Sequence, residues 1–186
     1  MHNFYKKNRG LLWLVTVLLS VVFDQITKYL AVVFLKPVAT VPIIKNALHL
    51  TYVTNYGAAF GILSDHRWVF LVISTLAIAV LSVLLLQKKN GHPLLCLSMS
   101  FIIGGGIGTM IDRIMLGYVV DFIDFRIINF AVFNVADIFV CVGCALMFLW
   151  ILFVPEASGN KTTTQDTDDT KDTTDTNEGN GHDTDG

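Results

Sequence analysis

Four long apolar segments separated by polar connections dominate the pattern of this chain. They are residues 11–35, 68–86, 94–116 and 132–154. A helix that crosses a bilayer takes about 20 apolar residues, so the pattern predicts four membrane-spanning helices. The first segment continues past Asp24 to residue 35 with no small-residue cleavage site, so we expect an uncleaved span rather than a leader.

Lysine and arginine are distributed unevenly over the connections, and their distribution predicts the direction of the spans. Three precede the first span within ten residues, and Lys88 and Lys89 lie in the short connection 87–93. The connection 36–67 also holds three, but spread over 32 residues. We therefore expect both termini in the cytoplasm and the connections 36–67 and 117–131 outside.

The two outer connections have patterns typical of short strands. Residues 38–44, interrupted by Pro42, and residues 47–54 are rich in β-branched and aromatic side chains, and residues 126–133 are a candidate for further strands. Residues 55–61 (N-Y-G-A-A-F-G) indicate a turn, because glycine and asparagine tolerate unusual backbone angles. We expect a small sheet resting on the membrane, with an apolar inner face.

The end of the chain differs in composition from the rest. Of the 13 basic and 15 acidic side chains, two and eight lie in residues 159–186, so residues 1–158 have a net charge of +4. The tail repeats Thr, Asp, Asn and Gly and cannot bury enough surface to offset chain entropy. The sequence thus predicts a four-span membrane domain, 1–158, and a disordered, acidic, Thr/Asp-rich cytoplasmic tail, 159–186.

Cysteine and histidine give no indication of a metal centre. Cys141 and Cys144 form a C-x-x-C inside an apolar helix segment, where we expect both to pack as small buried hydrophobes. The five histidines have no ligand spacing. We expect no metal, no cofactor and no nucleic-acid partner, and we expect a monomer surrounded by membrane lipids.

Carboxylates at the edges of the apolar segments are the main candidates for chemistry, because charge beside hydrocarbon is costly and usually functional. Five of the seven acids in residues 1–158 lie within or against the spans: Asp24, Asp112, Asp121, Asp124 and Asp137. Asp121 and Asp137 would face the same outer surface, where two carboxyls in a low-dielectric site share one proton. Such a pair supplies a base for water and an acid for a leaving amine. The residues alone leave Asp124 open as an alternative to Asp121.

Several polar groups also have structural interpretations. Asp112 and Arg113 would form an internal ion pair or an interface anchor. Asp24 and Lys28, four residues apart on one helix face, would pair with each other, and Asp24 would face the bundle interior. The glycines of residues 104–108 would let helices approach closely, since the Lys-Ser/Thr of a phosphate-binding loop is missing.

Three asparagine and aspartate positions near the outer surface have a structural interpretation as well. Asn134 or Asp137 would cap the fourth span. Asn55 lies in the predicted turn, where asparagine is more often structural than catalytic.

Five motifs, taken in order, resemble those of lipoprotein signal peptidase (signal peptidase II), a family of bacterial intramembrane aspartic proteases. They lie at residues 24–28 (D-Q-x-x-K), 55–61 (N-Y-G-A-A-F-G), 105–113 (G-G-I-G-T-M-I-D-R), 119–122 (V-V-D-F) and 133–137 (F-N-x-A-D). The resemblance covers about residues 10–155. One position departs from the family pattern: Thr109 stands where an asparagine is usual, and a hydroxyl cannot replace both the donor and the acceptor of an amide.

The resemblance implies a fold, a catalytic pair and a substrate. The fold is a four-transmembrane-helix bundle with a small extracytoplasmic β-sheet and a short outer helix. Asp121 and Asp137 become the catalytic pair, in preference to Asp124. Supporting roles fall to Asp24, Asn55, Gly108, Asp112, Arg113, Asn134 and Ala136. The substrate is a prolipoprotein whose cysteine carries diacylglycerol, cleaved just before that cysteine near the outer leaflet of the bacterial cytoplasmic (inner) membrane.

Two other functions fit intramembrane carboxylates. A small proton-coupled transporter would place polar groups along a path across the bilayer, whereas this sequence concentrates them near one face and shows no paired repeat. A scaffold that only binds lipoproteins would not need the acidic pair.

Overall fold

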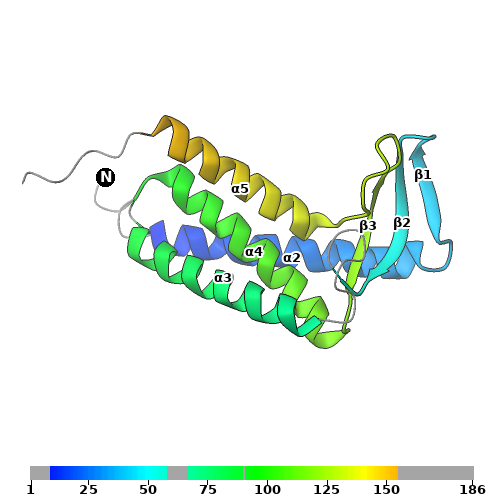
Figure 1. The fold of residues 1–186 in the computed structure, drawn as a ribbon, viewed down its shortest axis with the longest axis horizontal. Helices are drawn as coiled ribbons and strands as arrows, with labels where there is room; N and C mark the ends of the chain where they lie inside the picture. Colours follow the sequence, from blue (N-terminus) through cyan, green and yellow to red (C-terminus); the bar gives the residue numbers. More distant parts are fainter. Residues whose placement is uncertain (1–8, 58–66, 90, 155–186) are drawn as a thin grey trace, which may run out of the picture. The chain divides into compact units, whose positions relative to one another are not determined.

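Four helices and a small sheet make up the part of the chain that the computed structural model describes, residues 9–57, 67–89 and 91–154 (Figure 1). The helices are α2 (Arg9–Leu30), extended by a π-helical turn η1 (Ala31–Leu35), α3 (Arg67–Lys88), α4 (Pro93–Met115) and α5 (Val135–Phe153). All four are long and apolar enough to cross a membrane, which confirms the four predicted spans. The predicted tail, 159–186, and residues 58–61 of the predicted turn lie outside the described residues.

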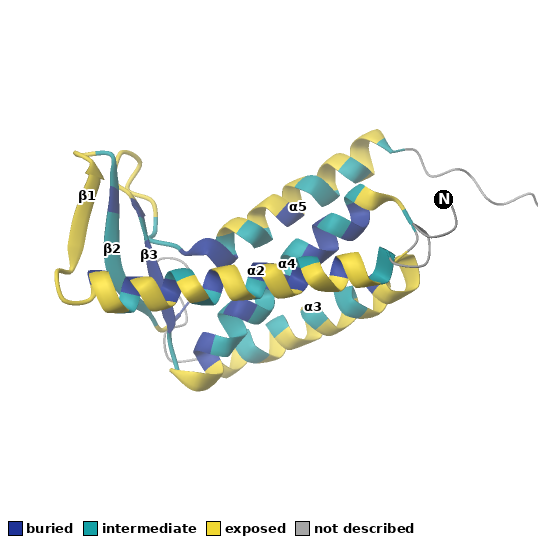
Figure 2. Cartoon of the chain, turned by 180° about the vertical axis from the view of Figure 1, so that it is seen from behind, coloured by how far each residue is buried: buried dark blue, intermediate teal, exposed yellow. Residues whose placement is uncertain are grey.

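The bundle is organised around α4, which packs against α2, α3 and α5. Buried side chains follow the inward faces of the helices, while the outward faces are exposed and almost entirely apolar (Figure 2). An exposed face of Leu, Val, Ile and Phe is what a helix presents to lipid rather than to water.

Small residues of α4 bring the helices close together, as the sequence predicted. A Cβ atom on Gly104 would lie 2.6 Å from Cβ of Ser20 on α2, and one on Gly105 would collide with the carbonyl of Ala136 on α5. A larger side chain at either position would push a neighbouring helix away.

The fourth span begins at Val135, three residues later than the hydropathy pattern predicted. Asn134 is the N-cap: its side chain accepts a hydrogen bond from the backbone N–H of Asp137, and the Asp137 carboxylate accepts one from the backbone N–H of Asn134. This reciprocal capping box satisfies donors that the first helical turn leaves unpaired, so it fixes where the helix starts. Of the two predicted caps, Asn134 is the cap and Asp137 is its partner.

The sheet lies at one end of the bundle and has the antiparallel order β1-β2-β3 (Figure 1). Its strands are β1 (Thr40–Ile44), β2 (Leu48–Asn55) and β3 (Val119–Phe125). The first two confirm the strands predicted in the first outer connection. The further strands predicted over residues 126–133 are wrong: only Phe133 pairs, in an isolated bridge to Ile123.

One face of the sheet closes the end of the bundle. Val120 and Phe122 of β3 form a buried cluster with Ala31 and Leu35 of η1 and with Val135. This cluster is the apolar inner face that the sequence predicted. The described residues include no separate short outer helix.

The two cysteines of the C-x-x-C motif do not pack in the core. Cys141 and Cys144 are free thiols on exposed positions of α5, so the predicted burial is wrong. A face exposed to lipid satisfies a small apolar side chain as well as a core does, and hydropathy cannot distinguish the two.

Candidate active site

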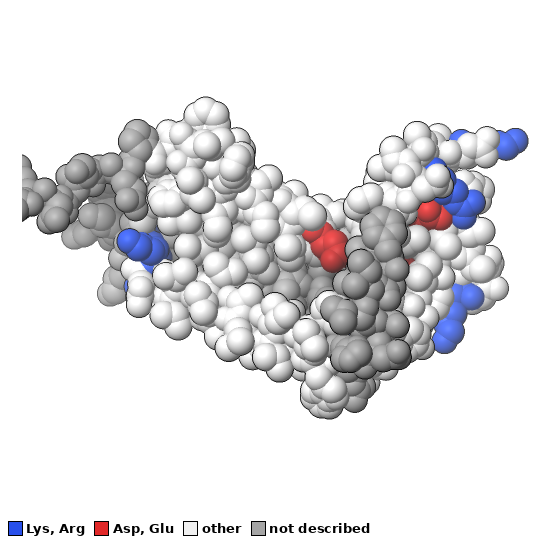
Figure 3. Space-filling view, viewed as in Figure 1, with Lys and Arg blue, Asp and Glu red and all other residues white. Residues whose placement is uncertain are grey.

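A cavity of about 490 Å³ opens where the sheet meets the start of α5 and the end of α4. Figure 3 shows this side of the molecule hollowed between the helices and the sheet, with acidic atoms at the base of the hollow. Polar and charged side chains line one part of the cavity, and apolar side chains line the rest. It consists of Asn55, Gly57, Thr109, Arg113, Val119, Asp121, Phe130, Ala131, Val132, Phe133, Asn134, Asp137, Ile138, Cys141 and Val142.

Asp121 lies on β3 with only 2% of its surface exposed. Its two carboxylate oxygens accept hydrogen bonds from different amides, Oδ2 from Nδ2 of Asn55 at 2.9 Å and Oδ1 from Nδ2 of Asn134 at 2.6 Å. Asn55 is opposite Val119 in the β2–β3 register, so it is a diagonal neighbour of Asp121 on the same face of the sheet.

The environment of Asp121 moves its pKa towards neutral pH. Burial raises the pKa of Asp121 to about 6, against the two amide hydrogen bonds, which lower it, and the nearby negative charge of Asp137 raises it further. A carboxyl with a pKa near 6 exchanges a proton readily close to neutral pH.

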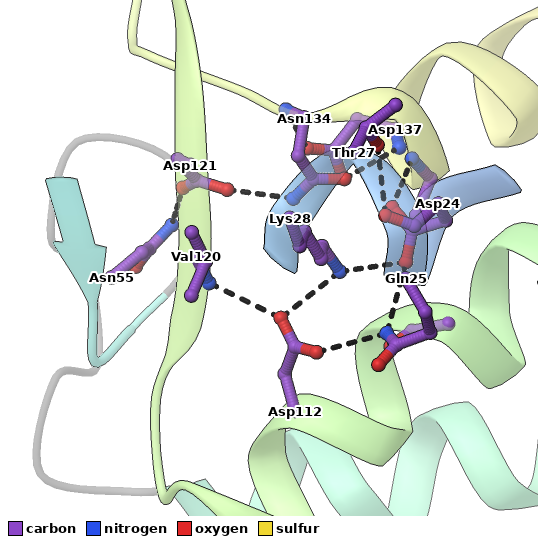
Figure 4. Close-up of polar contacts among 12 residues, drawn as sticks. Asp24, Gln25, Thr27, Lys28, Asn55, Asp112, Val120, Asp121, Asn134 and Asp137 are labelled. Atoms are coloured by element: carbon purple, nitrogen blue, oxygen red, sulfur yellow. Dashed lines mark hydrogen bonds and ion pairs between the residues drawn. The ribbon is translucent and has the colours of Figure 1, made fainter. Parts of the chain in front are cut away.

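Asn134 joins the two candidate catalytic carboxyls (Figure 4). Its amide nitrogen donates to Asp121, while its amide oxygen and backbone N–H complete the capping box with Asp137. One side chain, 1% exposed, therefore fixes the position of Asp121 relative to the first turn of α5. Asp137 is only partly buried and lines the same cavity.

Asp124 lies in a different environment, which separates it from the pair. Side chains alternate between the two faces of a strand, and Asp124 is three residues from Asp121, so the two point to opposite sides of β3. Asp124 accepts hydrogen bonds from Thr51 at 2.7 Å and from Arg126 at 2.9 Å. Burial raises the pKa of Asp124, but these two hydrogen bonds, together with the nearby charges of Arg126 and His49, hold the pKa below its ordinary value.

A buried ion triad lies behind the two candidate catalytic segments. Nζ of Lys28 is 2.9 Å from Asp24 Oδ2 and 3.0 Å from Asp112 Oδ2, which confirms the predicted Asp24–Lys28 pair. Asp24 also accepts a hydrogen bond from the backbone N–H of Ala136, and Asp112 accepts one from that of Val120. Ala136 and Val120 each directly precede an aspartate of the pair, so the triad holds both backbones together (Figure 4).

The predicted pair between Asp112 and Arg113 does not form. Adjacent residues on a helix point about 100° apart, and here they serve different partners. Asp112 joins the ion triad, whereas Arg113 donates to the carbonyl of Gly57 at 2.7 Å and stacks over the Phe70 ring at 4.5 Å. Arg113 also lines the cavity, where it places a permanent positive charge.

The ion triad of Asp24, Lys28 and Asp112 leaves no room for a side chain at Gly108. A Cβ atom at this position would collide with Oδ2 of Asp24. We expect Gly108→Ala to lower the free energy of unfolding by about 1–3 kcal/mol, because the carboxylate cannot move without breaking its contact with Lys28. Thermal unfolding of the detergent-purified protein measures this. Gly106→Ala is the control: its Cβ would lie 3.1 Å from the flexible end of Ile78, so an equal loss there would contradict the argument.

The structure thus brings together most of the residues that the motifs singled out. Asn55, Asn134 and Arg113 contact or line the cavity, and Asp24, Gly108, Asp112 and Ala136 belong to the layer behind it. Thr109, the departure from the family pattern, lines the cavity itself.

Two residues of the D-Q-x-x-K motif make more contacts than the sequence predicted. Gln25 donates to Asp24, to Asp112 and to the carbonyl of Gly108, and Lys28 has the second contact with Asp112. The polar D-Q-x-x-K run in an apolar span indicated a role for both side chains, but not that Asp112 of α4 would be their partner.

Comparisons of the sequence with protein families and with individual proteins point to the same family. The model of the family described as "Signal peptidase (SPase) II" matches residues 16–153. The lipoprotein signal peptidase of Clostridioides difficile (strain 630) is 41% identical over 148 residues, covering 80% of this chain and 99% of that protein. That of Halothermothrix orenii is 45% identical over 137 residues, covering 74% and 92%.

Two solved structures are also similar, both titled bacterial membrane enzymes. One, at 2.3 Å resolution, has a TM-score of 0.66 and 30% identity and covers 75% of this chain and 87% of its own. The other, at 1.9 Å, has a TM-score of 0.65 and 30% identity and covers 77% and 94%. The helices and the sheet therefore have counterparts in experimentally determined membrane enzymes.

Proposed function

Because this chain belongs to the signal peptidase II family of aspartic peptidases, the lipoprotein signal peptidases, we propose that Asp121 and Asp137 are its catalytic pair. Membership of that family, expected from the five motifs, is confirmed. The observation that supports the pair best is the position of Asn134, which contacts both aspartates at the floor of one cavity.

The proposed reaction is hydrolysis of a peptide bond by one water molecule. Asp121, ionised, accepts a proton from the water, whose oxygen attacks the peptide carbonyl carbon. Asp137, protonated, donates a proton to the departing nitrogen, so the carbonyl carbon gains a hydroxyl and the amine gains a hydrogen. Asn134 holds the base in place, and the guanidinium of Arg113 supplies positive charge at the cavity where negative charge develops on the carbonyl oxygen.

We propose that the substrates are prolipoproteins whose cysteine carries diacylglycerol, cleaved just before that cysteine. The apolar wall of the cavity, which includes Phe130, Val132, Ile138 and Val142, suits an apolar signal sequence beside a polar floor that performs the chemistry. The proposed orientation has both termini in the cytoplasm and the sheet at the outer leaflet, where a lipid-anchored cysteine lies. We propose that a monomer is active.

Paired substrates test this proposal. The purified protein is incubated with a diacylglyceryl-modified precursor and with the same precursor bearing serine in place of the modified cysteine. We expect cleavage of the first, with the new amino terminus at the modified cysteine, and little cleavage of the second. Equal cleavage of both, or cleavage at another bond, would reject the proposed substrate class.

The pKa of Asp121 predicts the pH dependence of cleavage. If Asp121 is the base, kcat/KM falls about tenfold per pH unit below pH 6, because the carboxylate becomes protonated. The hydrogen bond from Asn55 lowers this pKa, so Asn55→Ala should move the acid limb of the profile to higher pH. Thr51→Ala, which removes a donor from Asp124 instead, is the control and should leave the limb in place. A shift to lower pH in Asn55→Ala would contradict the assignment.

A further inference from the structure

A second cavity, of about 240 Å³, lies between α2 and α3, away from the sheet end of the bundle. Both helices pack against α4, which provides its floor through Ile103 and Ile107. The walls are apolar side chains of α2 and α3, among them Trp13, Leu14 and Leu86. The cavity is therefore an apolar groove between two membrane-spanning helices.

Basic residues lie at one end of this groove, at the boundary of the spans. Lys89, directly after α3, lines the groove. Its position is fixed: Nε1 of Trp13 donates to the Lys89 carbonyl at 3.0 Å, and the side chain packs across Gly10, where a Cβ atom would lie 3.4 Å from Lys89 Cδ. Arg9 follows at the same end, where it donates to the carbonyl of Gly91.

No carboxylate balances this charge in the described parts of the neighbouring helices. The first acid of α2 is Asp24 and that of α4 is Asp112, both at the sheet end, and α3 has none. Lysine and arginine beside an apolar groove at a membrane boundary attract an anionic headgroup, by about 1 kcal/mol for each basic side chain.

We propose that this groove binds one acyl chain of an anionic glycerophospholipid, with the phosphate at Lys89. A peptide helix is too large, because one turn about 10 Å across and 5.4 Å long occupies roughly 420 Å³. A hydrocarbon chain is much thinner than a helix, so part of one acyl chain can lie in the groove while the rest continues into the surrounding lipid. Under the proposed orientation this end faces the cytoplasm, so the ligand belongs to the inner leaflet, the opposite side of the membrane from the catalytic cavity.

Native mass spectrometry of the full chain, released from detergent with added phosphatidylglycerol or phosphatidylcholine, tests the site. We expect tighter binding of phosphatidylglycerol. Lys89→Gln should weaken that binding about fivefold, the change that corresponds to about 1 kcal/mol, and weaken phosphatidylcholine binding less, because the choline cation already offsets the phosphate charge. Lys45→Gln, an equal loss of charge on an exposed residue of the sheet turn, is the control and should change neither. Equal effects of the two substitutions would overturn the assignment of the phosphate to Lys89.

The acyl chain has its own test. Leu14 lines the groove from its exposed side, so Leu14→Trp should fill the space and weaken binding of both lipids with little risk to folding. Leu18 has the same exposure, 54%, and does not line the groove, so Leu18→Trp is the matched control. If the two variants bind lipid equally well, the groove is not the site. The peptidase activity of Lys89→Gln should equal that of the wild type, so this result is independent of the proposed catalytic pair.

Discussion

Replacing Asp121 or Asp137 with asparagine is expected to reduce the rate of precursor cleavage at least 10³-fold. A single general acid or base contributes about 10²–10⁴ to a rate, and each substitution removes one of the two proton-transfer groups while the other loses its partner. Asparagine has the shape of aspartate, and its carbonyl oxygen can still accept the hydrogen bond that Asn134 donates to either residue, while Asp121→Asn loses only the bond from Asn55. The loss should therefore be one of chemistry and not of folding.

The measurement is cleavage of the lipid-modified precursor under single-turnover conditions, with thermal unfolding of the same samples. Asp124→Asn is the control, because Asp124 points to the opposite face of β3 and contacts Arg126 instead of the cavity. It should retain most of the activity. Cleavage at the wild-type rate by either Asp121→Asn or Asp137→Asn would rule out the paired mechanism.

Lys28→Met is expected to cost about 3–5 kcal/mol of unfolding free energy and to abolish cleavage. Asp24 and Asp112 are 0% and 4% exposed, and without the Lys28 ammonium two carboxylates would face each other with no counter-charge. Both carboxylates hold backbone N–H groups next to the proposed catalytic pair, so their separation would displace Asp121 and Asp137 together.

Thermal unfolding and cleavage are measured on the same preparation, with Lys45→Met as the exposed control. A second variant tests whether the loss comes from the unbalanced charge. In the triple substitution Asp24→Asn, Lys28→Met and Asp112→Asn no uncompensated charge remains. We expect it to recover part of the lost stability, since exchange of a complete buried ion group for neutral residues is often tolerated. If the single Lys28→Met variant is as stable as Lys45→Met, the triad is not what holds the two segments.

The hydropathy pattern predicted the spans well, because a helix in lipid needs a long apolar run and little else. The Asp24–Lys28 contact was also predictable, since residues four apart meet on a helix. The contact of Lys28 with Asp112 was not, because it depends on how α2 and α4 pack. The sequence motifs gave Asp112 a supporting role but did not indicate Lys28 as its partner.

β3 shows why the sheet was predicted only in part. Its sequence, V-V-D-F-I-D-F, lacks a clean alternation because nearly all of its residues are buried, on both faces of the strand. The more regular apolar run after it, 126–133, forms a turn in which Asn129 has a positive φ of 47°. The alternation of side chains along β3 predicts that Asp121 and Asp124 point to opposite faces. Which of the two meets Asp137 depends on tertiary contacts, here those of Asn134 and Val135 with β3.

The outer edge of the sheet affects how copies of this protein can coexist in a crowded membrane. β1 is an edge strand with every residue exposed, and an exposed edge is a template on which another chain can add a strand and begin to aggregate. Pro42 offers no N–H there, and a bulge between Pro42 and Ile44 interrupts the regular repeat. Neighbouring molecules therefore find a poor surface for growing a shared sheet, even though the strand is apolar.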